Sequence, residues 1–198
     1  MPLNGAEFDF IVIGAGSAGC VIANRLSERP EHRVLLLEAG PKDSNPWIHV
    51  PIGYYRTMED RRINWDYRTA AVPGTEGRTF DWPRGKVLGG CSSINGLVYA
   101  RGQAEDFDHW RQLGNVGWGF EDVLPYFRKA EGASVDDLDE GFHGRGGPLG
   151  VSRASANPLC EAYIAAAEEA GIQRNADYNG KVQEGAGYFQ VTTRKGWR

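Results

Sequence analysis

Near the N-terminus, two short apolar runs flank a segment whose apolar residues have the spacing of a helix. Residues 10–13 (FIVI) and 34–37 (VLLL) each have the length and composition of a buried strand. Between them, apolar residues recur from Cys20 to Leu26 at the spacing of one helix face. Glycines at positions 14, 16 and 19 join the first run to the helix. This order predicts a strand, a tight turn, a helix and a second, parallel strand.

Three more helices are predicted in the second half of the chain. They cover residues 104–113 with Gly114 as the stop, 120–131, and 157–171, where Asn157 is the cap and Pro158 the first residue. Pro125 should bend the second of these helices or confine its regular part to one side. Residues 188–193 read as a strand, and residues 194–196 read as a turn.

Two segments lack regular periodicity. Five prolines punctuate residues 41–84, which predicts an extended, turning excursion with short strands and no long helices. We expect its tryptophans to pack in the core or as a lid, with cofactor stacking as the weaker alternative; they are Trp47, Trp65 and Trp82. Residues 134–150 are acidic and then glycine-rich, which predicts a solvated loop in which His143 has a structural role and no nearby partner.

The glycine turn and the acid after the second run suit one chemistry. Gly14 permits the sharp turn, Gly16 lets a pyrophosphate approach the backbone, and Gly19 lets helix and strand pack closely. The phosphates would lie at the helix N-terminus, where unpaired N–H groups favour negative charge. Glu38, 19 residues after Gly19, can accept hydrogen bonds from an adenosine ribose and would repel the extra phosphate of NADP. An ADP-containing dinucleotide fits, and FAD and NAD both remain open.

Composition narrows the class of protein. The 198 residues carry a formal charge of −4 and no basic run, which argues against nucleic acid as a partner. Three cysteines, odd in number and far apart, indicate free thiols in a reducing compartment. The first ten residues lack the pattern of a signal peptide, and no stretch reaches transmembrane length. We expect a cytoplasmic protein, with peripheral membrane association left open, and no metal site.

A second glycine-rich stretch covers residues 85–95 (GKVLGGCSSIN). Paired glycines followed by small hydroxyl residues suit a backbone that lies against a flat ligand or a phosphate. An ordinary structural turn would have the same composition. On composition alone the two interpretations are about even.

Three motifs resemble the glucose–methanol–choline (GMC) flavin oxidoreductases. FDFIVIGAGSAG…VLLLEAG resembles the N-terminal FAD motif of that family, and GKVLGGCSSINGLVYARGQAEDFD resembles its first signature. Residues 177–193 are also similar, and choline dehydrogenase-like and aliphatic alcohol dehydrogenase-like members are the nearest. The resemblance implies an α/β fold with a Rossmann-like FAD-binding βαβ start and an incomplete parallel sheet. Residues 1–150 would belong to the FAD-binding domain, and residues 151–198 would begin the substrate-binding domain.

The same resemblance implies the residues of the FAD site. The ADP end would be held by the first motif and the residues after its second strand: Gly14, Gly16, Ser17, Ala18, Gly19, Glu38 and Ala39. The second stretch would run along the isoalloxazine and pyrophosphate: Lys86, Val87, Leu88, Gly89, Gly90, Ser92, Asn95, Gly96, Leu97 and Val98. Some members have a covalent flavin–histidine bond at the position of Asn95, which asparagine cannot form. We therefore expect non-covalent FAD, and we expect Cys91 to be a small buried thiol.

The family oxidises an alcohol with a C-terminal histidine as base, and passes the electrons to oxygen, a quinone or another acceptor. His32, His49, His109 and His143 match no such motif, so no catalytic residue is assigned. We expect an N-terminal fragment of an FAD-dependent alcohol dehydrogenase. Alone it would be inactive, and unstable or only partly folded, because its core strands have open edges. The alternatives are a split, non-catalytic subunit that needs a partner chain, and an NAD-dependent dehydrogenase with a chance resemblance.

Overall fold

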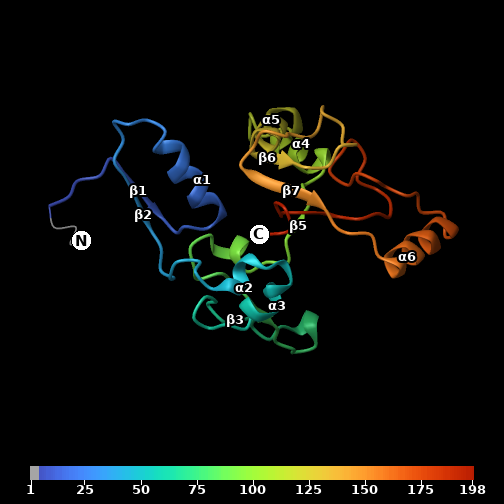
Figure 1. Cartoon of the computed structure of the whole chain (residues 1–198), viewed down its shortest axis with the longest axis horizontal. Helices are drawn as coiled ribbons and strands as arrows, with labels where there is room; N and C mark the ends of the chain where they lie inside the picture. The colour runs from blue at the N-terminus through green and yellow to red at the C-terminus, as the bar shows by residue number, and fades with distance from the viewer. Residues whose placement is uncertain (1–4) are drawn as a thin grey trace. The chain divides into compact units, whose positions relative to one another are not determined.

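The computed structural model describes residues 5–198, which form two compact units; Figure 1 labels most of their helices and strands. The first unit ends at Gly96 and also contains Trp197 and Arg198; the second is Leu97–Gly196. The predicted α/β class, with a βαβ start and small open sheets, is confirmed. The predicted domain boundary at residue 150 stays a prediction.

The first unit begins with the predicted βαβ arrangement. Strands β1 (Phe10–Ile13) and β2 (Val34–Leu37) pair in parallel, and helix α1 (Ser17–Leu26) connects them. The N–H of Gly14 donates to the carbonyl of Leu37 at 2.7 Å, which continues the pairing into the turn. The bounds of both strands agree with the apolar runs.

The expectation that these strands are buried is wrong for this chain. Ile11 and Ile13 are 59% and 84% exposed, whereas Val12, on the face that α1 covers, is 9% exposed. A parallel sheet normally has helices on both faces and strands on both sides. In residues 5–198 this sheet has two strands and one covering helix, so its other face meets solvent.

Short elements fill the rest of the first unit, as the prolines predict. They are α2 (Pro46–His49), η1 (Pro51–Gly53), α3 (Tyr54–Thr57), β3 (Tyr67–Arg68), η2 (Pro73–Thr75), β4 (Asp81–Trp82) and η3 (Gly90–Ser93). Their buried cluster consists of Ile48, Ile63, Val87 and Ile94. The three tryptophans lie outside it and are 42–51% exposed, so the prediction of core packing is wrong.

The second unit contains a four-stranded sheet in the order β5-β8-β7-β6. These strands are β5 (Val98–Tyr99), β6 (Glu131–Ala133), β7 (Leu149–Arg153) and β8 (Gln190–Val191). β6 and β7 are parallel, and the other two pairs are antiparallel. The strand predicted at residues 188–193 is shorter, because only Gln190 and Val191 pair with the neighbouring strands.

Three helices complete the second unit close to their predicted bounds. They are α4 (Ala104–Gln112), α5 (Phe120–Ala130) and α6 (Pro158–Glu169). Asn157 caps α6 through its side chain, and Gly171 follows with a φ of +86°. The prediction that Pro125 confines the regular part of α5 to one side is wrong, because the helix continues through this proline, which lies in its middle and lacks only its own N–H donor.

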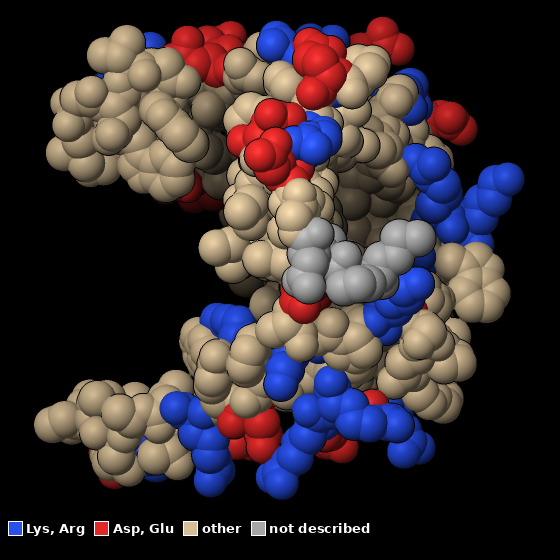
Figure 2. All heavy atoms as spheres, turned by 90° about the vertical axis from the view of Figure 1, so that its left-hand side faces the viewer, with Lys and Arg blue, Asp and Glu red and all other residues tan. Residues whose placement is uncertain are grey.

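The segment of residues 134–150 is only partly the solvated loop that its composition predicts. Its acidic side chains are exposed, but Val135 and Leu138 pack with Ala133 in a buried cluster, and His143 is 4% exposed. On the face of the molecule in Figure 2, basic and acidic side chains are interspersed. Within residues 5–198, no helix has the length and hydrophobicity to cross a bilayer.

Candidate cofactor-binding site

The first glycine turn leaves open space where a side chain would otherwise lie. Gly14 has a φ of +90°, which favours glycine, and the position of a Cβ on Gly16 has no atom within 4 Å. A Cβ on Gly19 would lie 1.9 Å from the Gly14 carbonyl oxygen, so this residue must be small for α1 to pack against the turn. The first helical hydrogen bond runs from Cys20 to Gly16, which leaves the amides of the first turn outside the ladder.

The Glu38 carboxylate links this turn to the segment that follows β2. Its Oε2 accepts a hydrogen bond from the Ala15 amide at 2.8 Å, and its Oε1 accepts one from the Gly40 amide at 2.9 Å. The carboxylate therefore holds the glycine turn to the end of β2. Each oxygen keeps further acceptor capacity for a hydroxyl group.

The second glycine-rich stretch is a tight turn around η3. Gly89 and Gly90 have φ values of +91° and +56°, and the hydroxyl of Ser93 donates to the Leu88 carbonyl at 2.8 Å. A Cβ on Gly85 would lie 2.1 Å from the Gly90 carbonyl oxygen, so the stretch folds back on its own backbone.

The two turns touch each other. The Gly89 amide donates to the Ala15 carbonyl at 2.7 Å, and a Cβ on Gly90 would lie 2.7 Å from the Gly16 Cα. Together they line an open groove of about 700 Å³. Its lining residues are Ile13, Gly14, Gly16, Ser17, Leu37, Glu38, Ala39, Trp65, Tyr67, Arg84, Gly85, Gly90 and Cys91.

The structure brings part of the predicted site residues to this groove. Gly14, Gly16, Ser17, Glu38, Ala39 and Gly90 line it. Val87 is fully buried in the core cluster, and Ser92 and Asn95 lie at the far end of η3, where they bind Arg198. Leu97 and Val98 belong to the second unit. The predicted contacts of these five residues with the cofactor stay predictions.

Trp65, Tyr67 and Arg84 line the groove and were not among the predicted cofactor-binding residues, whereas Lys86 was. Trp65 and Tyr67 stack with ring centroids 5.9 Å apart and planes at 8°, and the Lys86 ammonium lies 4.7 Å from the Trp65 ring centroid. The Arg84 guanidinium lies over the ring of Trp82 at 4.9 Å. Trp65 in the proline-rich stretch is the one signal that the sequence offers for this side of the groove. The groove thus has an aromatic side and cations beside bare backbone, which suits a ligand with flat rings and phosphates.

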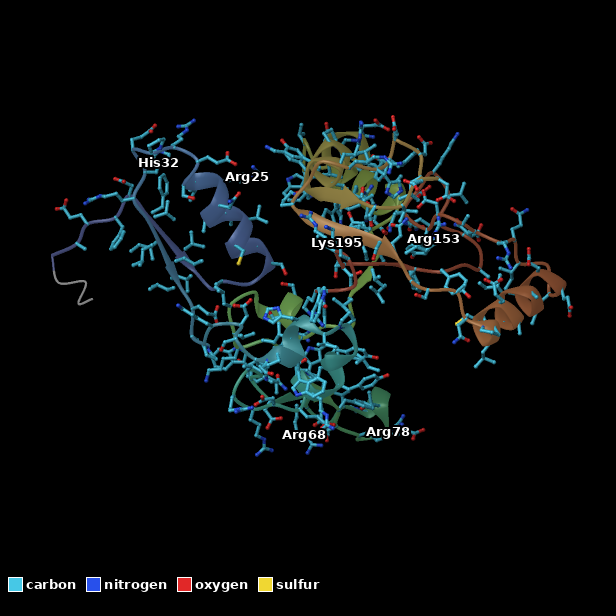
Figure 3. The ribbon with its side chains drawn as sticks, viewed as in Figure 1. Arg25, His32, Arg68, Arg78, Arg153 and Lys195 are labelled. Atoms are coloured by element: carbon cyan, nitrogen blue, oxygen red, sulfur yellow. The ribbon has the colours of Figure 1, made fainter. Side chains whose placement is uncertain are left out.

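Cys91 differs from its prediction. It is exposed and lines the groove, where the Gly85 amide approaches its sulfur at 3.4 Å, so it is not a buried thiol. Among residues 5–198, none of the four histidines lines the groove. His32 contacts the Leu26 carbonyl at 3.0 Å and packs edge-on against Phe10 (Figure 3).

His143 belongs to a buried polar network in the second unit. Its Nδ1 lies 2.9 Å from Glu131, its Nε2 lies 2.9 Å from Asp177, and Arg101 donates to Glu131 at 2.8 Å. Burial alone would lower the pKa of the His143 ring, but hydrogen bonds to Asp177 and Glu131, and their charges, raise it to about 9. The prediction that His143 has no partner is wrong, because Glu131 and Asp177 lie 12 and 34 residues away in the sequence and meet the ring only in the fold.

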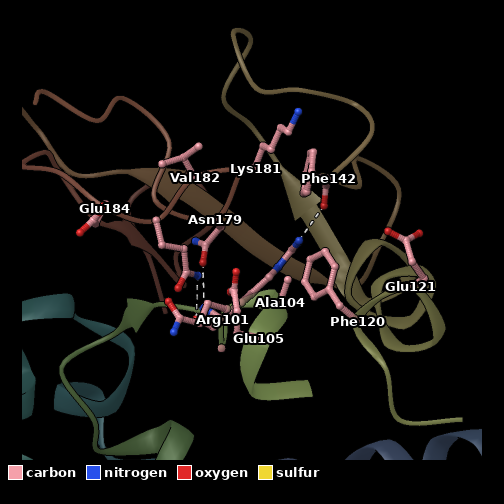
Figure 4. A pocket seen from close by; sticks show the side chains of 14 residues that line it. Arg101, Ala104, Glu105, Phe120, Glu121, Phe142, Asn179, Lys181, Val182 and Glu184 are labelled. Atoms are coloured by element: carbon pink, nitrogen blue, oxygen red, sulfur yellow. Dashed lines mark hydrogen bonds between the residues drawn. The ribbon is translucent and has the colours of Figure 1, made fainter. Parts of the chain in front are cut away.

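A second hollow, of about 620 Å³, lies beside this network within the second unit (Figure 4). Arg101 and Asn179 line it. The Arg101 guanidinium donates to the Tyr99 hydroxyl at 3.2 Å, to the Phe142 carbonyl at 2.6 Å and to Glu131 at 2.8 Å. Within the described part of the chain, no group of three or more acidic, histidine or cysteine side chains is arranged to hold a metal.

The family follows from comparison with known proteins. The family model described as GMC oxidoreductase matches residues 8–198. This chain belongs to the GMC oxidoreductase family. Alcohol dehydrogenase [acceptor] of Pseudomonas putida is 46% identical over 96% of this chain, and the mitochondrial choline dehydrogenase of Mus musculus is 47% identical over 97%. These alignments cover 35% and 33% of the two relatives, so the chain spans about a third of their length.

A solved structure is similar over nearly the whole of this chain. Pyridoxine 4-oxidase from Mesorbium loti superposes with a TM-score of 0.90 at 36% identity, over 97% of this chain and 38% of that protein. A match over nearly the whole chain removes the basis of the NAD-dependent alternative, which required the likeness at residues 85–95 to be chance. The part of the GMC fold present here contains the two glycine turns that meet at the groove.

Proposed function

We propose that this chain supplies the cofactor-binding part of an FAD-dependent oxidoreductase that acts on CH–OH groups of donors. FAD would lie non-covalently in the groove between the two glycine turns. The observation that carries the proposal is the contact of Gly89 and Gly90 with Ala15 and Gly16, since it puts two bare-backbone segments of a GMC chain on one groove.

Each wall of the groove has a part in binding. Gly16 leaves the space that a pyrophosphate needs, next to the amides at the start of α1. Glu38 can accept hydrogen bonds from ribose hydroxyls while it holds the glycine turn. Arg84 and Lys86 add positive charge near the phosphates. When bound, the flavin would accept the hydride from the alcohol carbon, and the protein positions it and tunes its electronics.

The substrate class we propose is primary alcohols, choline-like or aliphatic, with oxygen, a quinone or another electron acceptor as the second partner. The similarity to an alcohol dehydrogenase and a choline dehydrogenase supports this class. We propose a cytoplasmic protein whose 198-residue chain alone is inactive, because no histidine of the described residues lies in the groove.

The test is a titration of the purified chain with FAD, followed by flavin fluorescence and absorbance. Saturable binding at one site would support the proposal and would contradict the instability expected of the chain alone. We expect release of the flavin into the supernatant on acid precipitation, since Asn95 cannot bond to it. Flavin that stays in the pellet would contradict non-covalent binding, and a chain that binds NAD but not FAD would contradict the function. The coding sequence after codon 198 distinguishes the remaining alternative, a split subunit, by the presence or absence of a histidine motif.

A further inference from the structure

Arg198 binds the end of η3 that lies away from the groove. Its Nη1 donates to the Ser92 carbonyl and, at 2.8 Å, to the Asn95 side-chain oxygen, and its Nη2 donates to the Asn95 carbonyl at 2.6 Å. The Arg198 amide donates to the His49 carbonyl at 3.0 Å, which fixes the backbone of the arginine itself. A residue more than a hundred positions away thus closes this turn.

The chemistry of these contacts suits a clamp. The last carbonyls of a helical turn lack partners within the turn and favour a cation. A guanidinium is planar and has five donors, so it can bind several acceptors that lie in a fixed arrangement. The Ser92 carbonyl, the Asn95 carbonyl and the Asn95 side-chain oxygen present such acceptors, whereas a lysine ammonium could not reach all of them in the same geometry.

The other end of the same turn forms a wall of the groove. Gly90 meets Gly16, Cys91 faces the groove, and the Gly89 amide binds the Ala15 carbonyl. η3 has only four residues, so a shift at Ser92 or Asn95 moves Gly90 and Cys91 as well. Fixing one end of η3 therefore fixes the groove wall at the other.

We propose that Arg198 is a positioning residue: its guanidinium locks residues 89–95 in the shape that the groove requires, so that the cofactor meets a preformed wall. The identity of the cofactor rests on the proposed function, but the clamp does not. A preformed wall raises the affinity for the cofactor, because no binding free energy is then lost to ordering the turn.

The experiment compares the chain with its Arg198→Met, Arg198→Lys and Arg56→Met variants. Arg56 is an exposed arginine of the same unit that lies over the Trp47 ring, and it is the matched control. Amide hydrogen exchange is measured without cofactor for the peptide covering 88–96 and for the peptide covering α1. FAD affinity is measured by fluorescence titration.

In Arg198→Met, exchange in residues 88–96 should rise about tenfold, exchange in α1 should stay unchanged, and FAD should bind about tenfold more weakly. That factor corresponds to about 1.4 kcal/mol. Arg198→Lys should fall between Arg198→Met and the unchanged chain in both measurements, and Arg56→Met should match the unchanged chain.

Unchanged exchange at residues 88–96 in Arg198→Met would overturn the clamp. An equal rise of exchange in α1 would also overturn it, because it would mean general destabilisation. So would faster exchange at residues 88–96 with unchanged FAD affinity, in a chain that binds FAD. If the unchanged chain binds no FAD, the proposed function fails. The exchange data still decide whether Arg198 locks the turn.

Discussion

Replacing His143 by glutamine should remove most of the pH dependence of stability that the second unit shows above neutral pH. The ring lies between Glu131 and Asp177, at 2.9 Å from each, and is 4% exposed. Glutamine is neutral at every pH, so it can keep a hydrogen bond to one carboxylate without adding a charge.

The magnitude follows from the pKa of His143. That pKa is about 9 in the folded chain, against about 6.5 for an unperturbed histidine. Since one pKa unit corresponds to about 1.4 kcal/mol, protonation of the ring favours the folded state by about 3 kcal/mol. A folded-state pKa above the unfolded value gives stability that is fully present below pH 6.5 and is lost as the pH rises through 9.

The assay is urea unfolding at a series of pH values from 6 to 10, followed by tryptophan fluorescence. The free energy of unfolding of the unchanged chain should fall by about 3 kcal/mol more than that of His143→Gln over this range. His109→Gln, which changes an exposed histidine on α4, is the control and should keep the pH dependence of the unchanged chain. Parallel curves for His143→Gln and the unchanged chain would refute the raised pKa as a source of stability.

Three further predictions concern the groove. Gly16→Val should fold normally, because the Cβ position of Gly16 is open and its φ is −78°. Its FAD affinity should fall by on the order of a hundredfold, or about 2.7 kcal/mol. The control is Gly74→Val, also at an open position but outside the groove, which should bind FAD normally. Glu38→Ala removes an acceptor of two amides, so it should lower the melting temperature. A charged hydrogen bond contributes roughly 1.5–3 kcal/mol, so FAD affinity should fall about tenfold or more. Unchanged FAD affinity would argue against the ribose contact. Alkylation of Cys91 by iodoacetamide, followed by peptide mass spectrometry, should slow several-fold in saturating FAD. Alkylation of Cys160, which is also exposed, should not slow and is the control. Equal rates at Cys91 with and without FAD would exclude the groove as the binding site.

The sequence predicted local structure well where the cause is local. The bounds of β1, α1 and β2 follow from two apolar runs and the glycines between them. The cap and stop of α6 follow from Asn157, Pro158 and Gly171. In each case neighbouring residues decide the backbone geometry, so a reading of a few consecutive positions is enough.

Properties that depend on distant residues were decided by the tertiary structure. Pairing of the two glycine turns depends on the backbones of Ala15 and Gly89, which meet only after residues 41–84 have folded back. The exposure of Cys91 and of the tryptophans depends on which surfaces the described chain covers, and the partners of His143 and Arg198 come from far along the chain. Local pattern thus determined that this protein has two bare-backbone turns. Only long-range packing decided that they share a groove, because a hydrogen bond between distant segments leaves no periodicity in the sequence.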